Sequence, residues 1–332
     1  MAQPVEMVEV WRGDFLESRH RGHAVICDAQ GNIVEAWGDP DAVILPRSSA
    51  KMIQALPLVE SGAADAFGLG VDRLALSCAS HQGAPIHTGM VRTWLGELGL
   101  DDDAFRCGAE VPRDTETKHA MIRAGGAPCQ WHNNCSGKHS GFLTLTRHLG
   151  AGPEYVDPGH PVQLAVREAF EDVTGMESPG FGIDGCSAPN FATTVHGLAR
   201  AMGFFAGANI DGGSTRERAA ARLRDAMRAF PELVAGEGRA CTELMRAMDG
   251  RVALKTGAEA VFVAMLPEQK LGIALKIVDG ATRASECAIA ALLVKLGALA
   301  ARHPATLKRM NVPIRNWRGI ETGIIRPAEA LR

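Results

Sequence analysis

The sequence predicts an α+β fold: an αβα sandwich whose antiparallel sheet is built from both ends of the chain, together with a helical region. Three observations lead to this prediction. β-leaning runs separated by turn residues occur near the N-terminus and again near residue 260, and helical patterns lie between them. We therefore expect a single domain over residues 1–332, with sheet-forming ends at about 5–45 and 250–303 and a helix-rich middle at about 47–250.

The strands are predicted as two hairpins. Residues 23–28 and 33–37 are β-leaning, and the sequence Ala-Gln-Gly-Asn at 29–32 supplies the turn residues between them. Near the other end, the runs 260–266 and 271–278 flank a short polar segment in the same way. Because the two hairpins lie at opposite ends of the chain, we expect the ends to share one sheet.

The helices are predicted from their punctuation. Residues 161–174 begin with proline and are followed by glycine, which is typical of a helix start and stop. A second helix over 214–230 opens with the capping-box pair Ser214 and Glu217 and ends before a proline. A long helical pattern runs from about Thr282 to His303.

Composition excludes several classes of function. The net charge of −3, with lysine and arginine scattered along the chain, gives no basic patch for nucleic acid or for an anionic membrane. No run of 18 apolar residues predicts a membrane span, and acidic residues near the N-terminus argue against a signal peptide, so we expect a cytoplasmic protein. The eight cysteines include no CxxC pair and predict neither a disulfide framework nor a zinc finger.

A serine and a lysine three residues apart form the first candidate catalytic pair. Ser48 is expected in the first turn of a helix, where Lys51 lies on the same face. A neutral Lys51 amine could take the Ser48 proton, and the helix N-terminus would stabilise the developing alkoxide. The alternative is that Ser48 only caps the helix and Lys51 is a solvated lysine.

A Lys-Thr-Gly triplet beginning at Lys255 supports the catalytic interpretation. Serine hydrolases of the penicillin-recognising type combine S-x-x-K near the start of the chain with K-T-G on a strand near its end. The S-D-N element of that pattern is absent, and Ser80, in the loop 77–83, is the nearest hydroxyl that could pair with Lys255. The alternative for Lys255 is a surface lysine at a hairpin.

The segment 133–141 concentrates reactive side chains before a helical run. Cys135, Lys138 and His139 lie within five positions and could supply part of a metal site completed from elsewhere, with Cys186 as a plausible further ligand. A competing hypothesis makes Cys135 a thiolate nucleophile with His139 as its base.

Taken together, six segments closely resemble the rhizobial-type, or class 3, L-asparaginases. These segments are RSSAK (47–51), CASH (78–81), NCSGKH (134–139), DGC (184–186), PELVAGEGRACTELMRAMDG (231–250) and LKTGA (254–258). The resemblance spans residues from about 8 to 280. It implies a fold related to serine β-lactamases, penicillin-binding proteins and glutaminases, usually assembled as a homodimer.

The resemblance also assigns roles to individual residues. It implies two catalytic pairs, Ser48 with Lys51 and Ser80 with Lys255, and a nearby zinc ion. The remaining assignments are zinc ligands at Cys135, Lys138 and Cys186, substrate-binding positions at Arg47, Asn134, His139 and Asp184, and a cysteine near the pocket at Cys241. One departure concerns Thr256, because some members of the family carry another residue there.

The predicted function is therefore an L-asparaginase that hydrolyses L-asparagine to L-aspartate and ammonia through a serine acyl-enzyme. The zinc ion is expected to modulate the pocket rather than to be strictly required. A glutaminase or another serine amidase of the same fold is the first alternative. The second is a non-enzymatic sensor of zinc or an amino acid, in which the residues Cys135, Lys138 and Cys186 would be the functional centre.

Overall fold

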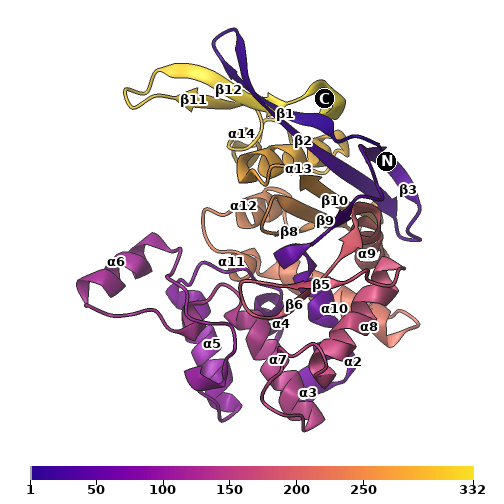
Figure 1. Cartoon of the computed structure of the whole chain (residues 1–332), viewed down its shortest axis with the longest axis vertical. Coiled ribbons are helices and arrows are strands. Elements are labelled where there is room, and N and C mark those ends of the chain that lie inside the picture. Colours follow the sequence, from indigo (N-terminus) through magenta and orange to yellow (C-terminus); the bar gives the residue numbers. More distant parts are fainter. Residues whose placement is uncertain (1) are drawn as a thin grey trace. The chain divides into compact units, whose positions relative to one another are not determined.

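The computed structural model describes residues 2–332 (Figure 1). These residues form two compact units. The first, here called the sheet unit, comprises 2–49, 193–207 and 243–332. The second, the helical unit, comprises 50–192 and 208–242. The single-domain organisation expected from the sequence stays a prediction.

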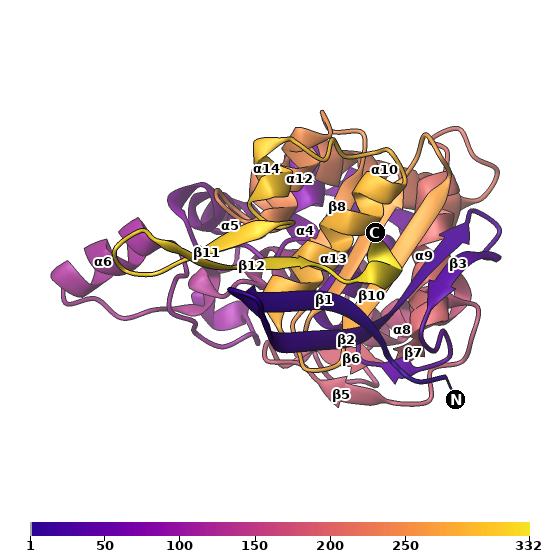
Figure 2. The same ribbon diagram turned by 90° about the horizontal axis from the view of Figure 1, so that it is seen from above.

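The sheet unit is built on one antiparallel sheet, which has eight strands among the described residues. Its order is β11-β12-β1-β2-β10-β9-β8, and β3 also pairs with β2. Figure 2 shows β12, β1 and β2 side by side although they come from opposite ends of the chain. The strands of this unit, including the small pair β4 and β7, are β1 (Val5–Arg12), β2 (Phe15–Asp28), β3 (Ile33–Trp37), β4 (Val43–Ile44), β7 (Thr193–Thr194), β8 (Ala253–Thr256), β9 (Val261–Leu266), β10 (Leu271–Ile277), β11 (Val312–Arg315) and β12 (Glu321–Pro327).

Helices cover both faces of this sheet. Every residue of β9 is buried, as expected for a strand with both faces covered. α9 (Val195–Gly207) packs on β2, β9 and β10, and α13 (Thr282–Lys295) packs on β1, β9, β10 and β12. The approach of α9 depends on glycine, because a Cβ on Gly272 would lie 2.0 Å from the backbone nitrogen of Gly203.

The structure confirms the antiparallel sheet built from both chain ends and both predicted hairpins. The C-terminal strands β11 and β12 were outside the prediction. The long helix expected to reach His303 is wrong in its end, because α13 stops at Lys295. Gly297 then adopts φ +70°, and the Ala298 N–H bonds the Leu293 carbonyl, which closes the helix with a left-handed glycine.

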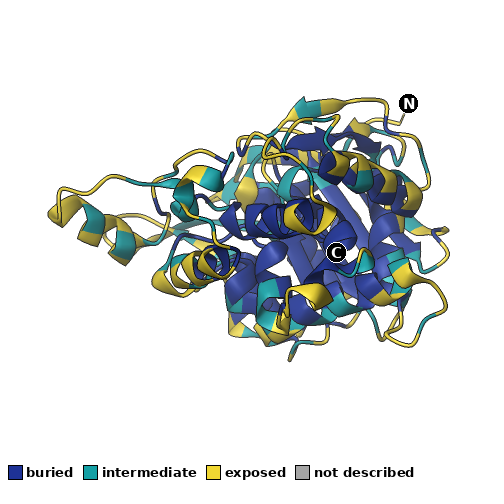
Figure 3. Ribbon diagram, turned by 90° about the horizontal axis from the view of Figure 1, so that it is seen from below, coloured by how far each residue is buried: buried dark blue, intermediate teal, exposed yellow. Residues whose placement is uncertain are grey.

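The helical unit is organised around α7 (Ser136–Leu149), whose residues 136–146 are all buried. The predicted helix at 161–174 is confirmed, and Ser214 caps α10 by accepting the Glu217 N–H at 3.0 Å. Figure 3 shows α6 as an exposed arm with no buried residue. The other elements are α1 (Lys51–Gln54), α2 (Leu56–Glu60), α3 (Ala63–Ala66), α4 (Val71–Ser77), α5 (Pro85–Glu97), α6 (Thr115–Arg123), α8 (Pro161–Thr174), β5 (Phe181–Ile183), β6 (Pro189–Phe191), α10 (Thr215–Ala229) and α11 (Pro231–Val234).

Two further helices complete the description. α12 (Ala240–Ala247) runs from the helical unit into the sheet unit, and α14 (Pro304–Leu307) belongs to the sheet unit. Among residues 2–332, no helix is both long and apolar enough to cross a membrane.

Candidate functional site

Four of the predicted site residues meet inside the helical unit. Lys51 begins α1, Cys135 and Lys138 lie at the start of α7, and Cys186 lies in the turn between β5 and β6. The Lys51 Nζ is 3.1 Å from the Cys135 Sγ, and the Lys138 Nζ is 3.1 Å from the Cys186 Sγ. We call Lys51, Cys135, Lys138 and Cys186 the thiol–amine cluster; each of the four side chains is at least 96% buried.

Backbone features hold the cluster in place. The Lys51 amine also donates to the Ala79 carbonyl, which ties α1 to the loop that carries Ser80. In the β5–β6 turn, the residue after Cys186 is Ser187, which adopts φ +67° and donates its N–H to the Asp184 carbonyl at 2.8 Å. A non-glycine residue with positive φ is strained, and such strain is often found at functional sites.

The charges of the cluster are coupled. The hydrogen bond with Cys135 and the nearby Lys138 ammonium hold the pKa of the Cys186 thiol well below its usual range. The same hydrogen bond and burial raise the pKa of Cys135. Burial lowers the pKa of Lys138, but the neighbouring thiol groups of Cys186 and Cys135 outweigh it and raise the pKa overall. The cluster therefore favours one thiolate, shared between Cys186 and Cys135, beside the Lys138 ammonium.

The donor set of Cys135, Lys138 and Cys186 fits a zinc ion on the condition that the Lys138 amine loses its proton. Within residues 2–332, no three His, Cys, Asp or Glu side chains group so that they could hold a metal, so a lysine must be the third ligand. Two sulfurs and one nitrogen are donors that zinc prefers, and tetrahedral zinc would place a sulfur and a nitrogen ligand about 3.6 Å apart. The observed 3.1 Å would open by roughly 0.5 Å on binding, and Lys138 would have to lose its proton.

His139 follows Lys138 and is completely buried. Its Nδ1 is 2.9 Å from the Tyr155 hydroxyl, and its Nε2 has no hydrogen-bond partner within the described part of the chain. Burial and the Lys138 charge hold the pKa of His139 well below its usual range, so the ring is neutral. The hypothesis of a Cys135 nucleophile with His139 as its base stays a prediction, and the raised pKa of Cys135 disfavours a thiolate there.

The Ser80 loop is fixed by a second set of histidine contacts. The Ser80 N–H donates to the Val234 carbonyl at 2.9 Å. His81 accepts the Gly83 N–H at Nδ1, so its Nε2 carries the proton and donates to the Ser136 hydroxyl at 2.9 Å. The His81 ring stacks on the buried His87 ring with centroids 4.9 Å apart. These contacts tie the loop to the start of α7, next to Cys135.

The other predicted site residues of the helical unit lie outside the four-residue thiol–amine cluster. Asn134 is half-buried, and its side-chain amide donates to Glu110 at 2.6 Å. Asp184 is also half-buried, in the same turn as Cys186. Cys241 is buried in α12.

Three predicted residues lie in the sheet unit: Arg47, Ser48 and Lys255. Arg47 adopts φ +54°, and Ser48 follows it in a 3-10 turn over Arg47–Ala50 that runs directly into α1. A Cβ on Gly257 would lie 2.7 Å from the Pro46 carbonyl oxygen. The Lys-Thr-Gly triplet and the segment that carries Ser48 are therefore in close backbone contact within this unit.

The structure tests the alternatives for the two lysines. Lys51 and Lys255 are each only 1% exposed, so the solvated Lys51 and the surface Lys255 considered from the sequence are both wrong. Each predicted pair, Ser48–Lys51 and Ser80–Lys255, has one member in each unit, and the pairing itself stays a prediction. The sequence prediction did not include Tyr155, although the sequence shows that it is the only tyrosine of the chain.

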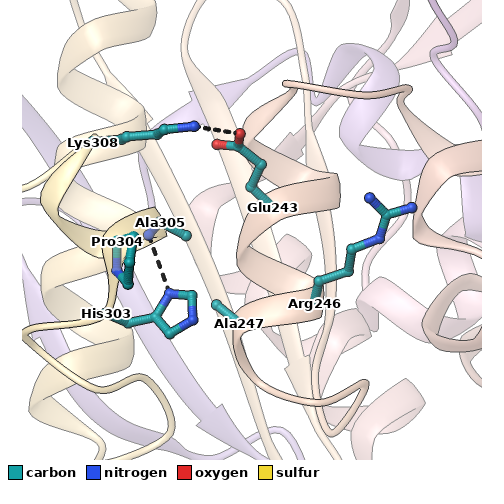
Figure 4. Close-up of a pocket in the computed structure, with 7 residues that line it drawn as sticks. All are labelled: Glu243, Arg246, Ala247, His303, Pro304, Ala305 and Lys308. Carbon is teal, nitrogen blue, oxygen red and sulfur yellow. Dashed lines mark hydrogen bonds and ion pairs between the residues drawn. The ribbon is translucent and has the colours of Figure 1, made fainter.

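A concave surface lies in the sheet unit. It is a groove of about 300 Å³ between α12 and α14 (Figure 4). Lys308 donates to Glu243 across one end, and the His303 Nδ1 accepts the Ala305 N–H at 3.1 Å. None of the predicted site residues lines this groove.

Comparison with known proteins finds a family model that matches nearly the whole chain. The family model described as L-asparaginase II matches residues 8–327. No curated protein matches the chain. Among solved structures, Mglu in its native form is 15% identical, with a TM-score of 0.47 over 89% of this chain and 69% of that chain.

Two other solved structures are similar at the same level. Mglu in its glutamate form is 13% identical, with a TM-score of 0.48 over 90% of this chain and 66% of that chain. A β-lactamase from Mycobacterium bovis, Mb2281c, is 14% identical, with a TM-score of 0.44 over 82% of this chain and 94% of that chain. The chain thus spans about two thirds of the length of the Mglu chains that it matches.

Proposed function

Because the chain belongs to the L-asparaginase II family over residues 8–327, we propose that it hydrolyses L-asparagine to L-aspartate and ammonia. Family membership supports an amidohydrolase. The observation that carries the proposed chemistry is the buried Lys51 amine, which is held by the Ala79 carbonyl and is 3.1 Å from the Cys135 sulfur. The Lys51 amine is removed from water at the start of the helix that follows Ser48. A buried amine in this position is suited to proton transfer, whereas a solvent-exposed lysine mainly contributes to solubility.

In the proposed mechanism, Ser48 is the nucleophile. Its Oγ forms a bond to the side-chain amide carbon while Lys51 accepts the hydroxyl proton. The carbon–nitrogen bond then breaks, and ammonia leaves with a proton returned by the lysine. Water hydrolyses the resulting β-aspartyl ester and regenerates Ser48. The strained backbone of Arg47 fixes the direction from which Ser48 enters its turn.

Ser80 and Lys255 form the proposed second pair. The Ser80 loop is fixed at its backbone by the Val234 carbonyl and, through His81, by the Ser136 hydroxyl. The Lys255 amine is buried and donates to the Thr256 carbonyl at 2.7 Å. We assign this pair to relaying that proton from Lys51 to the leaving ammonia.

Cys135, Lys138 and Cys186 are the residues that would hold a zinc ion. When bound, zinc would supply positive charge beside the substrate-binding groups and so strengthen the binding of a carboxylate. The protein's own contribution is to lower the pKa of the Cys186 thiol. The raised pKa of Lys138 opposes zinc, because this amine must give up its proton before it can bind the metal. Because that amine must be neutral to bind metal, zinc binding weakens as the pH falls. A homodimer remains part of this proposal.

The experiment is ammonia release from L-asparagine and from L-glutamine, with zinc-loaded and chelated protein in parallel. The Ser48→Ala variant is expected to lose turnover by at least about 1000-fold. Ser49→Ala is the matched control, since Ser49 is the adjacent serine and its buried hydroxyl donates to the Pro46 carbonyl at 2.7 Å. Release from asparagine that survives in Ser48→Ala would refute the nucleophile, and release from glutamine alone would refute the substrate.

Binding of asparagine without ammonia release, by folded and zinc-loaded protein, would favour the sensor hypothesis. Lys51→Met tests the proposed base in the same assay. Turnover near the wild-type rate in Lys51→Met would exclude Lys51 as the proton acceptor, whatever the fate of Ser48→Ala.

A further inference from the structure

We propose that Tyr155 is a positioning residue that fixes His139 as a hydrogen-bond donor at Nε2, so that His139 binds an acceptor oxygen of the substrate and not a metal ion. The inference rests on the proposed function for the identity of that oxygen, a carboxylate of the amino acid. It rests on this structure alone for the proton position. Tyr155 is the single tyrosine of the chain, and it is completely buried beside the thiol–amine cluster.

The proton position follows from counting hydrogens along one chain of contacts. The Arg106 backbone N–H donates to the Tyr155 Oη at 2.7 Å, and a backbone amide can only donate. The Tyr155 Oη lies 2.9 Å from the His139 Nδ1. If Nδ1 carried a hydrogen, the tyrosine oxygen would accept twice and its own hydrogen would be buried without an acceptor among the described residues. The hydroxyl therefore donates to Nδ1, and Nε2 carries the imidazole hydrogen.

The Nε2–H group is buried and has no hydrogen-bond partner within residues 2–332. Leaving a buried donor unpaired costs about 1 to 3 kcal/mol, so such a group in a candidate site indicates that a ligand completes it. A nitrogen that carries hydrogen has no lone pair for a metal, whereas it can donate to a carboxylate. His139 thus belongs to the substrate side of the site, and the metal side is left to Cys135, Lys138 and Cys186.

The Tyr155 ring is itself held against rotation and displacement. The Gln163 side-chain amide donates to the Tyr155 carbonyl at 2.7 Å. The rings of Tyr155 and His139 meet edge to face with centroids 5.4 Å apart, and Phe142 packs against the imidazole at 5.6 Å. Because both rings are fixed by packing, the direction of the Nε2–H bond is set before any ligand arrives.

The first measurement is the tautomer of His139 in protein labelled with ¹⁵N-histidine. The signal of His139 is assigned by its loss in His139→Gln. Wild type is expected to show hydrogen on Nε2 and a bare Nδ1, and Tyr155→Phe, which removes the donor to Nδ1, is expected to show a mixture of tautomers. Hydrogen on Nδ1 in wild type, or an unchanged spectrum in Tyr155→Phe, would overturn the proposal. This readout needs no turnover, so it is independent of the proposed reaction.

The second measurement separates positioning from packing. Tyr155→Phe is expected to raise KM for L-asparagine about tenfold with kcat changed by no more than about twofold, because one hydrogen bond to the bound substrate loses its alignment. The dissociation constant of L-aspartate, measured by calorimetry, is expected to rise by the same factor and replaces KM if the protein turns over no asparagine. Thr144→Val is the control, since it removes the buried 3.0 Å bond between α7 and the Trp94 indole without touching His139.

His139→Gln places an amide donor near the Nε2 position and is expected to keep more binding than His139→Leu. In the His139→Gln background, Tyr155→Phe is expected to have no further effect on KM or on L-aspartate binding. Additive losses in the double variant would show that Tyr155 acts only through packing, and equal losses in His139→Gln and His139→Leu would show that the donor does not matter. Either result refutes the assignment.

Discussion

Gly137 offers a quantitative test of how closely the start of α7 must approach α4. Gly137 lies between Ser136 and Lys138, and a Cβ built on it would be 2.3 Å from the Leu76 carbonyl oxygen. Real Cβ contacts are essentially never below 3.0 Å, so Gly137→Ala forces the two backbones apart by at least about 0.7 Å. Since Cys135 and Lys138 flank Gly137, the displacement should also move these two members of the thiol–amine cluster.

The expected cost is about 2 kcal/mol of unfolding free energy, the middle of the range for overpacking a well-packed interior. Gly141→Ala is the matched control in the same helix: its Cβ would be 3.2 Å from the Leu58 Cδ2, a flexible side-chain atom. Because alanine is the better helix former by about 1 kcal/mol, Gly141→Ala should be neutral or slightly stabilising.

The assay is urea unfolding followed by circular dichroism, with zinc affinity measured on the same samples. Gly137→Ala should lower the unfolding midpoint and weaken zinc binding, whereas Gly141→Ala should change neither. Equal stability of the two variants would refute the close approach of α7 and α4. Lower stability of Gly137→Ala with unchanged zinc affinity would refute the link between this packing and the cluster.

Three further outcomes are expected. Cys186→Ser should abolish tight zinc binding in equilibrium dialysis. In wild type, the zinc affinity should fall about tenfold or more per pH unit below neutrality, because the raised pKa of Lys138 keeps that ligand protonated. A pH-independent affinity would exclude the lysine as a ligand. Burial raises the pKa of Glu243, but hydrogen bonds from Lys308 and Arg309 outweigh it and hold the pKa below its usual value. The stability that Glu243 contributes is therefore present above the unfolded-state pKa of about 4.3 and is lost as the pH falls through the folded-state pKa. Glu243→Gln should therefore cost about 2 kcal/mol near pH 7 and progressively less in acid, as chemical unfolding across pH will show. Trp317 is fully exposed, and Trp317→Ser should change the unfolding free energy by less than about 0.5 kcal/mol in the same assay.

The sheet could be predicted where hydrophobic runs meet local turn residues. The turn at 29–32 and the polar segment at 267–270 each join strands that pair directly, so the signal and the contact lie close together in the sequence. The strands Val312–Arg315 and Glu321–Pro327 gave no such signal, because they are exposed or half-exposed along most of their length. Glu321–Pro327 pairs with β1, about 300 residues away, and Val312–Arg315 joins the sheet by pairing with Glu321–Pro327. Non-local pairing of this kind is not encoded in any one window of sequence.

The candidate site shows the same division. Cys135 and Lys138 were recognisable because Cys135, Lys138 and His139 lie within five positions, around Gly137, directly before and at the start of a helical run. Tyr155 was not, since a single tyrosine in a loop has no periodicity, and its contact with His139 arises only when the loop before α8 folds against α7. Residue type therefore predicted which groups could react, and only the fold showed which of these groups contact one another.

The thiol–amine cluster also indicates that the helical unit loses some folding stability by burying its candidate site. Two lysines and two cysteines are buried together, and a buried ammonium–thiolate pair regains through mutual attraction only part of what its desolvation costs. Replacing both partners with apolar residues of similar volume is often neutral or stabilising, whereas removing one partner leaves a charge unpaired. Lys138→Met with Cys186→Val should thus unfold at a urea concentration no lower than wild type, while Cys186→Val alone should unfold earlier. A double variant less stable than the single one would mean that the cluster exists to hold the fold, and the case for a functional site at these residues would fail.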